Sequence, residues 1–340
     1  MDFFGFSNQC LKENSIIDAD FKTDAPVIGV LTVPLSKKRQ SHIANHLKSY
    51  LANSYVQWLE MGGARVVPIC YHWPFSKINE ILSQINGVLF PGGAVDRVFN
   101  TDFYDYVKVY HHIFNYAKRQ QHFPLWGTCL GFEFLMLVSK YTPDEIYDIQ
   151  IVGKDKDHEL RNDVKATNDI VPIKLIKETY INDTRFFSNF NDCYISEITS
   201  PSVFMNHDYA IDYNKIDKAS YEKNIHILST NKDREGNEYI STIEFKDHPF
   251  FGTQWHPEKV IFEWLDKSIP HDPFSQYVSR TVCQMFVNEC KKNSNKFRDQ
   301  KLLIYYYTLY SREEVMKIIE KKYNNQKNKS LFEQCYYFEE

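Results

Sequence analysis

Short apolar runs alternate with stretches of helical spacing over the first 140 residues of this chain. Buried strands are predicted by apolar or β-branched runs at 26–33, 65–69, 87–90 and 123–127. Helices are predicted where apolar residues recur at helical period, over 43–61, 75–85, 102–119 and 130–139. Strands that alternate with helices in this way are typical of a parallel sheet covered on both faces.

The second half of the chain is richer in predicted strands, at 225–230, 239–245 and 250–254, before a helix over 273–290. It contains no internal repeat and no long low-complexity linker. We therefore predict a single α/β domain with a central, mostly parallel sheet flanked by helices. The domain is expected to run from residue 25 to 340, after an N-terminal extension over residues 1–24.

Composition excludes several classes of partner. The net charge of −4 gives no basic surface, which argues against nucleic acid as a partner. No apolar run approaches the roughly 18 residues that a membrane span requires. The seven cysteines show neither the spacing of a metal site nor a disulfide framework, so no metal is expected.

The clearest chemical signal is the Gly-x-Cys-x-Gly sequence around Cys129, which lies between a predicted strand and a predicted helix. Gly127 and Gly131 would permit a sharp turn that holds the middle residue in a strained conformation, as in a nucleophile elbow. The start of the helix would favour the thiolate, and the N–H of Leu130 would be free to face an oxyanion. A lone cysteine is more often a small buried residue, but the flanking glycines favour a nucleophile here.

A second candidate follows the strand predicted at 250–254, where the chain reads Trp-His256-Pro-Glu258. In an extended segment, residues two positions apart face the same side, so His256 and Glu258 are expected to face one site. A histidine base needs a third group to fix its tautomer, and a carboxylate is suited to that task. Alone, such a segment is usually a surface turn; together with Cys129 it predicts a catalytic triad.

Two further positions are weaker candidates. Gly93, in the Pro-Gly-Gly loop after the third predicted strand, would let its N–H approach an oxyanion as a second donor. His207 lies in the polar segment Phe-Met-Asn-His-Asp, where a histidine is normally solvated. The residues alone therefore give His207 no assured role.

Together these motifs resemble the three signatures of class I glutamine amidotransferase-like hydrolases: Pro-Gly-Gly at 91–93, Gly-Thr-Cys-Leu-Gly at 127–131 and Trp-His-Pro-Glu at 255–258. More narrowly, the chain resembles γ-glutamyl hydrolases, the enzymes that trim folate polyglutamates. The narrower likeness is supported by the stretches 52–60, 63–68, 86–90, 123–126 and 332–336. The resemblance therefore runs from about Pro26 to the end of the chain.

The resemblance implies a flavodoxin-like, class I glutamine amidotransferase-like fold that needs no metal or organic cofactor. It implies that Cys129 is the nucleophile, that His256 is the general base and acid, and that Glu258 holds the third place. His207 falls where the family has a histidine thought to touch substrate. The implied substrate is a small molecule, a poly-γ-glutamyl folate, and a homodimer is also implied.

The family resemblance further implies a secreted or a lysosomal or vacuolar protein, yet residues 1–24 lack the basic and apolar regions of a secretory signal. Glycosylation-type sequons at Asn182 and Asn328 give mild support to a secretory route. Two other functions stay open. One is a glutaminase subunit that supplies ammonia to a partner synthase, and the other is a catalytically silent binding protein of the same fold.

Overall fold

The structure is a computed structural model that describes residues 21–35, 46–96, 101–152, 158–177, 180–191, 200–314 and 332–339. Its centre is a seven-stranded sheet with the strand order β11-β12-β13-β6-β5-β1-β4. In chain order the strands are β1 (Val27–Leu31), β4 (Arg65–Ile69), β5 (Gly87–Phe90), β6 (Leu125–Thr128), β11 (Ile225–Lys232), β12 (Glu238–Phe245) and β13 (Phe250–Thr253). All neighbours from β4 to β13 pair in parallel, whereas β12 and β11 extend the sheet in antiparallel fashion.

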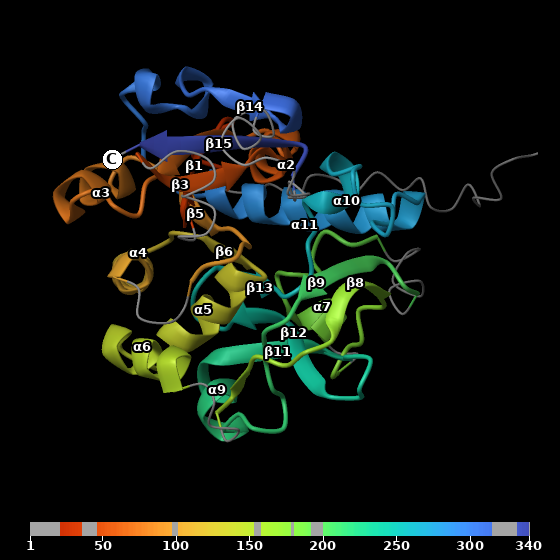
Figure 1. Cartoon of the computed structure of the whole chain (residues 1–340). Coiled ribbons are helices and arrows are strands. Elements are labelled where there is room, and N and C mark those ends of the chain that lie inside the picture. The colour runs from red at the N-terminus through yellow and green to blue at the C-terminus, as the bar shows by residue number, and fades with distance from the viewer. Residues whose placement is uncertain are drawn as a thin grey trace, which may run out of the picture.

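Each face of this sheet has its own hydrophobic core. Successive side chains of β1 alternate between the two cores: Val27 and Leu31 belong to one, and Ile28 and Val30 to the other. The first core is covered by α3 (Phe75–Leu82), α4 (Thr101–Lys118), α5 (Leu130–Val138) and α6 (Pro143–Val152). The second is covered by α2 (Asn53–Met61) and α11 (Pro273–Lys291). Figure 1 shows α11 and the pair α5 and α6 in different layers of the molecule.

The prediction of a single α/β domain with a mostly parallel sheet between helices is confirmed. Within the described ranges, no helix is long and apolar enough to cross a bilayer. The division into an extension over 1–24 and a domain from 25 onward stays a prediction, because residues 1–20 lie outside the described part of the chain.

A second, antiparallel sheet corrects the helix predicted over 43–61. It has the order β14-β15-β3-β2, formed by β2 (Val33–Pro34), β3 (Leu47–Ala52), β14 (Leu309–Ser311) and β15 (Gln334–Glu339). The predicted helix begins only at Asn53, because residues 47–52 form β3 and pair with the C-terminal strand β15. Figure 1 shows β15 alongside the N-terminal part of the chain. This long-range pairing overrides the local helical spacing.

The remaining elements lie outside the central sheet. They are β7 (Leu160–Arg161), β8 (Ala166–Val171), α7 (Tyr180–Asp183), β9 (Val203–His207), β10 (Ala210–Ile211), α9 (Lys218–Asn224), α10 (Lys259–Phe262) and the 3-10 turns at Gln300–Leu302 and Ile304–Tyr306. Strands β8 and β9 form an antiparallel two-stranded sheet, as do β7 and β10. Of the two predicted sequons, Asn182 is exposed on α7, whereas Asn328 lies outside the described residues.

Candidate active site

Three neighbouring strands bring the predicted motifs together. Strands β5, β6 and β13 lie side by side in parallel, so their carboxyl ends meet at one edge of the sheet. The loop after β5 carries Gly93, β6 leads into Cys129, and β13 leads into His256. The N–H of Cys129 donates to the carbonyl of Thr253 at 2.8 Å, which joins two of these strand ends directly.

Cys129 occupies the sharp turn that the sequence predicted. Its backbone has φ 52° and ψ −110°, a conformation that side-chain-bearing residues seldom adopt. The flanking glycines are needed for close packing, because a Cβ on Gly131 would lie 2.1 Å from the carbonyl oxygen of Phe90. A Cβ on Gly127 would lie 2.7 Å from the carbonyl oxygen of Gly131. The turn thus places the thiol beyond the end of β6, at the first turn of α5.

His256 and Glu258 form a buried pair, but not in the way the sequence predicted. His256 Nδ1 lies 2.7 Å from Glu258 Oε1, and the side chains are only 5% and 1% exposed. The segment is not extended: β13 ends at Thr253, and Glu258 has the helical angles φ −67° and ψ −31°. The turn at Pro257 bends the carboxylate back onto the ring. Since a carboxylate only accepts, Nδ1 carries the proton and Nε2 is left to exchange one.

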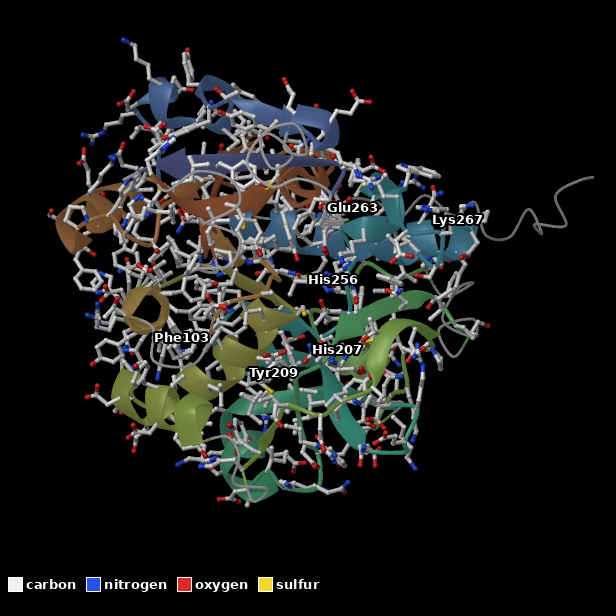
Figure 2. All side chains as sticks on the ribbon, viewed as in Figure 1. Phe103, His207, Tyr209, His256, Glu263 and Lys267 are labelled. Carbon is white, nitrogen blue, oxygen red and sulfur yellow. The ribbon has the colours of Figure 1, made fainter. Side chains whose placement is uncertain are left out.

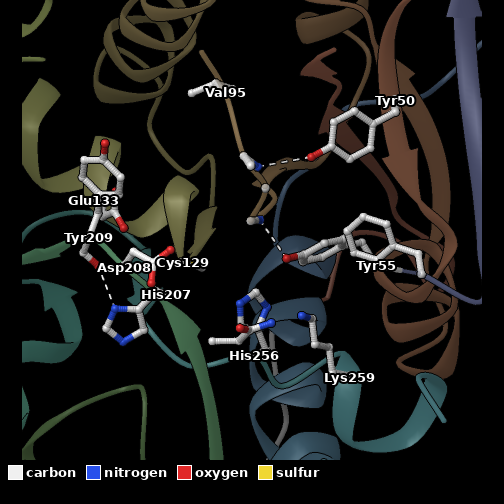
Figure 3. A pocket seen from close by; sticks show the side chains of 15 residues that line it. Tyr50, Tyr55, Val95, Cys129, Glu133, His207, Asp208, Tyr209, His256 and Lys259 are labelled. Atoms are coloured by element: carbon white, nitrogen blue, oxygen red, sulfur yellow. Dashed lines mark hydrogen bonds between the residues drawn. The ribbon is translucent and has the colours of Figure 1, made fainter. Parts of the chain in front are cut away.

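Gly92 lies between the cysteine and the histidine. A Cβ on this glycine would be 2.9 Å from His256 Cε1 and 3.1 Å from Cys129 Cβ, so both side chains border the same small space. That space opens into a cavity of about 260 Å³, which we call the Cys129 cavity. Its lining includes Tyr55, Gly93, Cys129, His207, His256 and Lys259 (Figure 3). In Figure 2, His207 and His256 both lie near the middle of the molecule.

Burial sets the charge of the cysteine and the histidine. Burial, and then the negative charge of Glu133, raise the pKa of the Cys129 thiol to about 12, although the charge of Lys259 opposes them. Burial and the charge of Lys259 lower the pKa of His256 below its usual value, although Glu258 opposes them. At neutral pH the site therefore holds a thiol beside a neutral imidazole. The thiolate expected from the helix dipole is not the resting form, because desolvation outweighs the dipole.

Of the two predicted oxyanion donors, Gly93 lines the cavity and Leu130 directly follows Cys129. The N–H of Leu130 lowers the pKa of the Cys129 thiol, against the larger effect of burial. In the Pro-Gly-Gly loop, the N–H of Gly92 donates to the Tyr55 hydroxyl at 2.7 Å and that of Ala94 to the Tyr50 hydroxyl at 3.3 Å. The intervening N–H of Gly93 makes no hydrogen bond to another described residue. Figure 3 shows both tyrosines bonded to this loop.

His207 is buried rather than solvated. It ends β9, is 6% exposed and lines the Cys129 cavity. Its Nδ1 donates to the carbonyl of Tyr209 at 2.7 Å, and burial lowers the pKa of the ring to about 3. The ring is therefore neutral, and its buried Nε2 has no partner among the described residues. An unpaired acceptor of this kind suits a donor group on a bound molecule.

Sequence reasoning missed several residues that line the cavity, among them Tyr55, Lys259 and Glu133. Tyr55 on α2 supports the Pro-Gly-Gly loop, Lys259 begins α10, and Glu133 accepts from Gln254 Nε2 at 3.2 Å. The available signals were the position of Lys259 directly after Glu258 and that of Glu133 one helical turn after Cys129. No group of metal-binding side chains occurs within the described ranges.

Replacing Tyr55 by phenylalanine should lower turnover without unfolding the protein. The Gly92 N–H would lose its acceptor inside a buried loop, a cost of about 1–3 kcal/mol that would loosen the neighbouring Gly93 amide. We expect kcat to fall about tenfold or more, measured by steady-state hydrolysis. Tyr104→Phe is the matched control, because that hydroxyl bonds Asp144 on α6 and leaves the cavity intact. Equal activities of the two variants would contradict this role of Tyr55.

Comparison with known proteins identifies the family. The peptidase C26 family model matches residues 26–258. γ-Glutamyl hydrolase B of Dictyostelium discoideum is 34% identical over 287 residues, which cover 82% of this chain and 76% of that protein. The human γ-glutamyl hydrolase is 30% identical over 330 residues, which cover 92% of this chain and 90% of that protein. A solved glutamine amidotransferase from Thermotoga maritima has a TM-score of 0.43 and 12% identity, over 80% of this chain and 100% of that one.

A cysteine together with a buried histidine–carboxylate pair, at the strand ends of an α/β sheet, is an arrangement that thiol hydrolases use. The chain belongs to the peptidase C26 family, and it is a hydrolase. Its predicted resemblance to γ-glutamyl hydrolases is confirmed.

Proposed function

We propose that this enzyme hydrolyses amide bonds made through the γ-carboxyl group of glutamate, with folate poly-γ-glutamates as its substrates. The observation that carries the proposal is the meeting of Cys129 with the His256–Glu258 pair around Gly92, in a cavity of about 260 Å³. The relatives named γ-glutamyl hydrolase support the bond type. The triad supports a covalent route through a thioester.

In the first half of the reaction, Cys129 attacks the γ-carbonyl carbon as its proton passes to His256 Nε2. Glu258 stabilises the imidazolium through Nδ1, and the Leu130 and Gly93 N–H groups donate to the oxyanion. The tetrahedral intermediate then breaks its C–N bond. The departing nitrogen takes the proton from His256, which leaves a γ-glutamyl thioester on Cys129 and a free amine.

In the second half, water attacks the thioester carbonyl while His256 takes one of its protons. The same two amides hold the second oxyanion. The C–S bond breaks, the sulfur regains the proton from His256, and the γ-carboxylic acid leaves. We place His207 on the substrate, because its unpaired Nε2 is available to accept a hydrogen bond in the cavity.

The bond type and the substrate are tested by one comparison. Purified protein is incubated with a folate pentaglutamate, with an α-linked glutamate peptide and with free glutamine, and the products are identified by mass spectrometry. We expect shortened folates and free glutamate or γ-glutamyl peptides from the first, and little product from the other two. Rapid release of ammonia from glutamine, with intact pentaglutamate, would favour the glutaminase instead. No product from any of the three would favour a silent binding protein.

A further inference from the structure

Glu263 is a buried carboxyl group that the proposed mechanism does not use. Only 3% of it is exposed, and it directly follows α10, but it does not belong to the described residues that line the Cys129 cavity. Burial raises its pKa to about 7, against the effect of the Glu333 N–H. Burying an ionisable group costs free energy unless its polar atoms are bonded. The contacts of Glu263 therefore indicate its role.

Glu263 bonds the C-terminal segment through Glu333. Its Oε2 accepts from the Glu333 N–H at 3.0 Å, and the Trp264 N–H donates to Glu333 Oε1 at 3.0 Å. We call these two bonds the Glu263–Glu333 link. The Glu333 carbonyl accepts from the Arg312 N–H at 3.0 Å. The backbone of Glu333 is therefore bonded at both its N–H and its carbonyl.

The bonded N–H belongs to the peptide group that follows Phe332, and Phe332 lines the Cys129 cavity. The centre of the Phe332 ring lies 6.1 Å from that of Tyr50 and 6.0 Å from the Lys259 ammonium. Both of these neighbours also line the cavity. The ring thus forms an apolar part of the cavity wall, and its position depends on the peptide group that Glu263 bonds.

Helix α10 connects this part of the wall to the catalytic histidine. The helix is four residues long and starts directly after Glu258, whose Oε1 lies 2.7 Å from His256 Nδ1. At the other end of the helix, the Glu263 N–H donates to the Lys259 carbonyl at 3.0 Å. In the view of Figure 2, Glu263 lies between His256 and strand β15. One short helix therefore sets the place of the Glu263–Glu333 link relative to His256.

We propose that Glu263 is a positioning residue that fixes Phe332 in the wall of the Cys129 cavity, where the Phe332 ring contacts the glutamyl side chain of the substrate. A glutamyl group has two methylene groups beside the γ-carbonyl, and an apolar surface stabilises them when they leave water. A ring that is free to move offers less of this contact, and ordering it on binding costs free energy. The inference rests on the proposed γ-glutamyl hydrolysis and names a residue outside the triad on which substrate binding depends.

The test separates binding from chemistry. The Kd for a folate pentaglutamate is measured by calorimetry in the Cys129→Ala background, and KM and kcat are measured with Cys129 present. Glu263→Ala removes the acceptor, so we expect Kd and KM to rise at least about tenfold and kcat to stay within about threefold. A smaller amount of folded enzyme would instead lower kcat and leave KM in place. Glu263→Gln keeps an oxygen that accepts the N–H and should keep all three constants within about threefold.

Phe332→Ala tests whether Glu263 acts through this ring. Alone it should raise KM by a similar factor, and adding Glu263→Ala should raise KM no further. Glu244→Ala is the matched control. That carboxylate on β12 is also 3% exposed and accepts from the Phe186 N–H at 2.9 Å, but it does not line the cavity. The control should lose stability and keep its KM.

An unchanged KM in Glu263→Ala would overturn the inference, as would an equal rise in Glu263→Gln or losses that multiply in the double variant. If Glu263→Ala does not fold, Glu263→Asp takes its place, because it withdraws the carboxylate by one methylene and should also raise KM. A wild type that binds the pentaglutamate without cleaving it would refute the proposed function, and the Kd values would still decide the inference. A wild type that neither binds nor cleaves it would refute both.

Discussion

Cys129→Ala is expected to abolish hydrolysis, with kcat lowered by a factor on the order of 10⁴–10⁶. The thiol is the group placed at the strained turn, beside the Leu130 amide and across Gly92 from His256. Alanine removes the sulfur and fills no new space, so the turn and the cavity should survive. Steady-state product release from a γ-glutamyl substrate measures the effect.

A covalent intermediate gives a second readout for the same variant. Wild-type enzyme quenched with acid during turnover should carry a γ-glutamyl mass on the peptide that contains Cys129, and the variant should carry none. Cys70→Ala is the matched control, since this cysteine is also buried but follows β4 and packs in the second core. It should stay active despite a small loss of stability. A covalent mass on another residue, or turnover by Cys129→Ala, would exclude the proposed nucleophile.

His256→Gln should lower kcat/KM by a factor on the order of 10⁴. The activity that remains should no longer fall as the pH is lowered. Burial and Lys259 depress the pKa of His256, so the neutral base is present at neutral pH and is lost only when the pH falls through a value below 6.5. Wild-type activity should therefore fall with decreasing pH only below pH 6.5, and we call this fall the acid limb. Residual activity of the variant should lack that limb.

The control for this prediction is His112→Gln. The pKa of His112 is also lowered by burial, but the residue lies on α4 and bonds Asn79 outside the cavity. Its replacement should leave both the rate and the acid limb in place. A wild-type acid limb above pH 6.5, or one that persists in His256→Gln, would show that another group supplies the base.

The sequence predicted the parts of this site that depend on local chain geometry. Gly-x-Cys-x-Gly between a strand and a helix allows few arrangements, and the structure holds Cys129 at positive φ as expected. Parallel strands meet at their carboxyl ends, so the proximity of the cysteine and histidine segments could be foreseen. The sequence correctly predicts that Glu258 lies beside His256, but it predicts an extended segment between them. In the structure a turn joins the two residues.

Other features depend on contacts between distant residues. Residues 47–52 have helical spacing but form β3, because β15 supplies strand partners from the far end of the sequence. The support of the Pro-Gly-Gly loop by Tyr55 arises only when α2 packs beside that loop. The depth at which a thiol is buried, which makes it neutral at rest, likewise follows from packing and not from a motif.

The pairing of β15 with β3 also bears on the order in which the parts of the site are made. Tyr50, which holds the Ala94 amide, lies on β3 between Val33 and Tyr337 of β15. During synthesis Cys129 and His256 are made well before residues 334–339. The strand that pairs with β3 behind Tyr50 is therefore made after the cysteine and the histidine, so this wall of the cavity is completed after both of them.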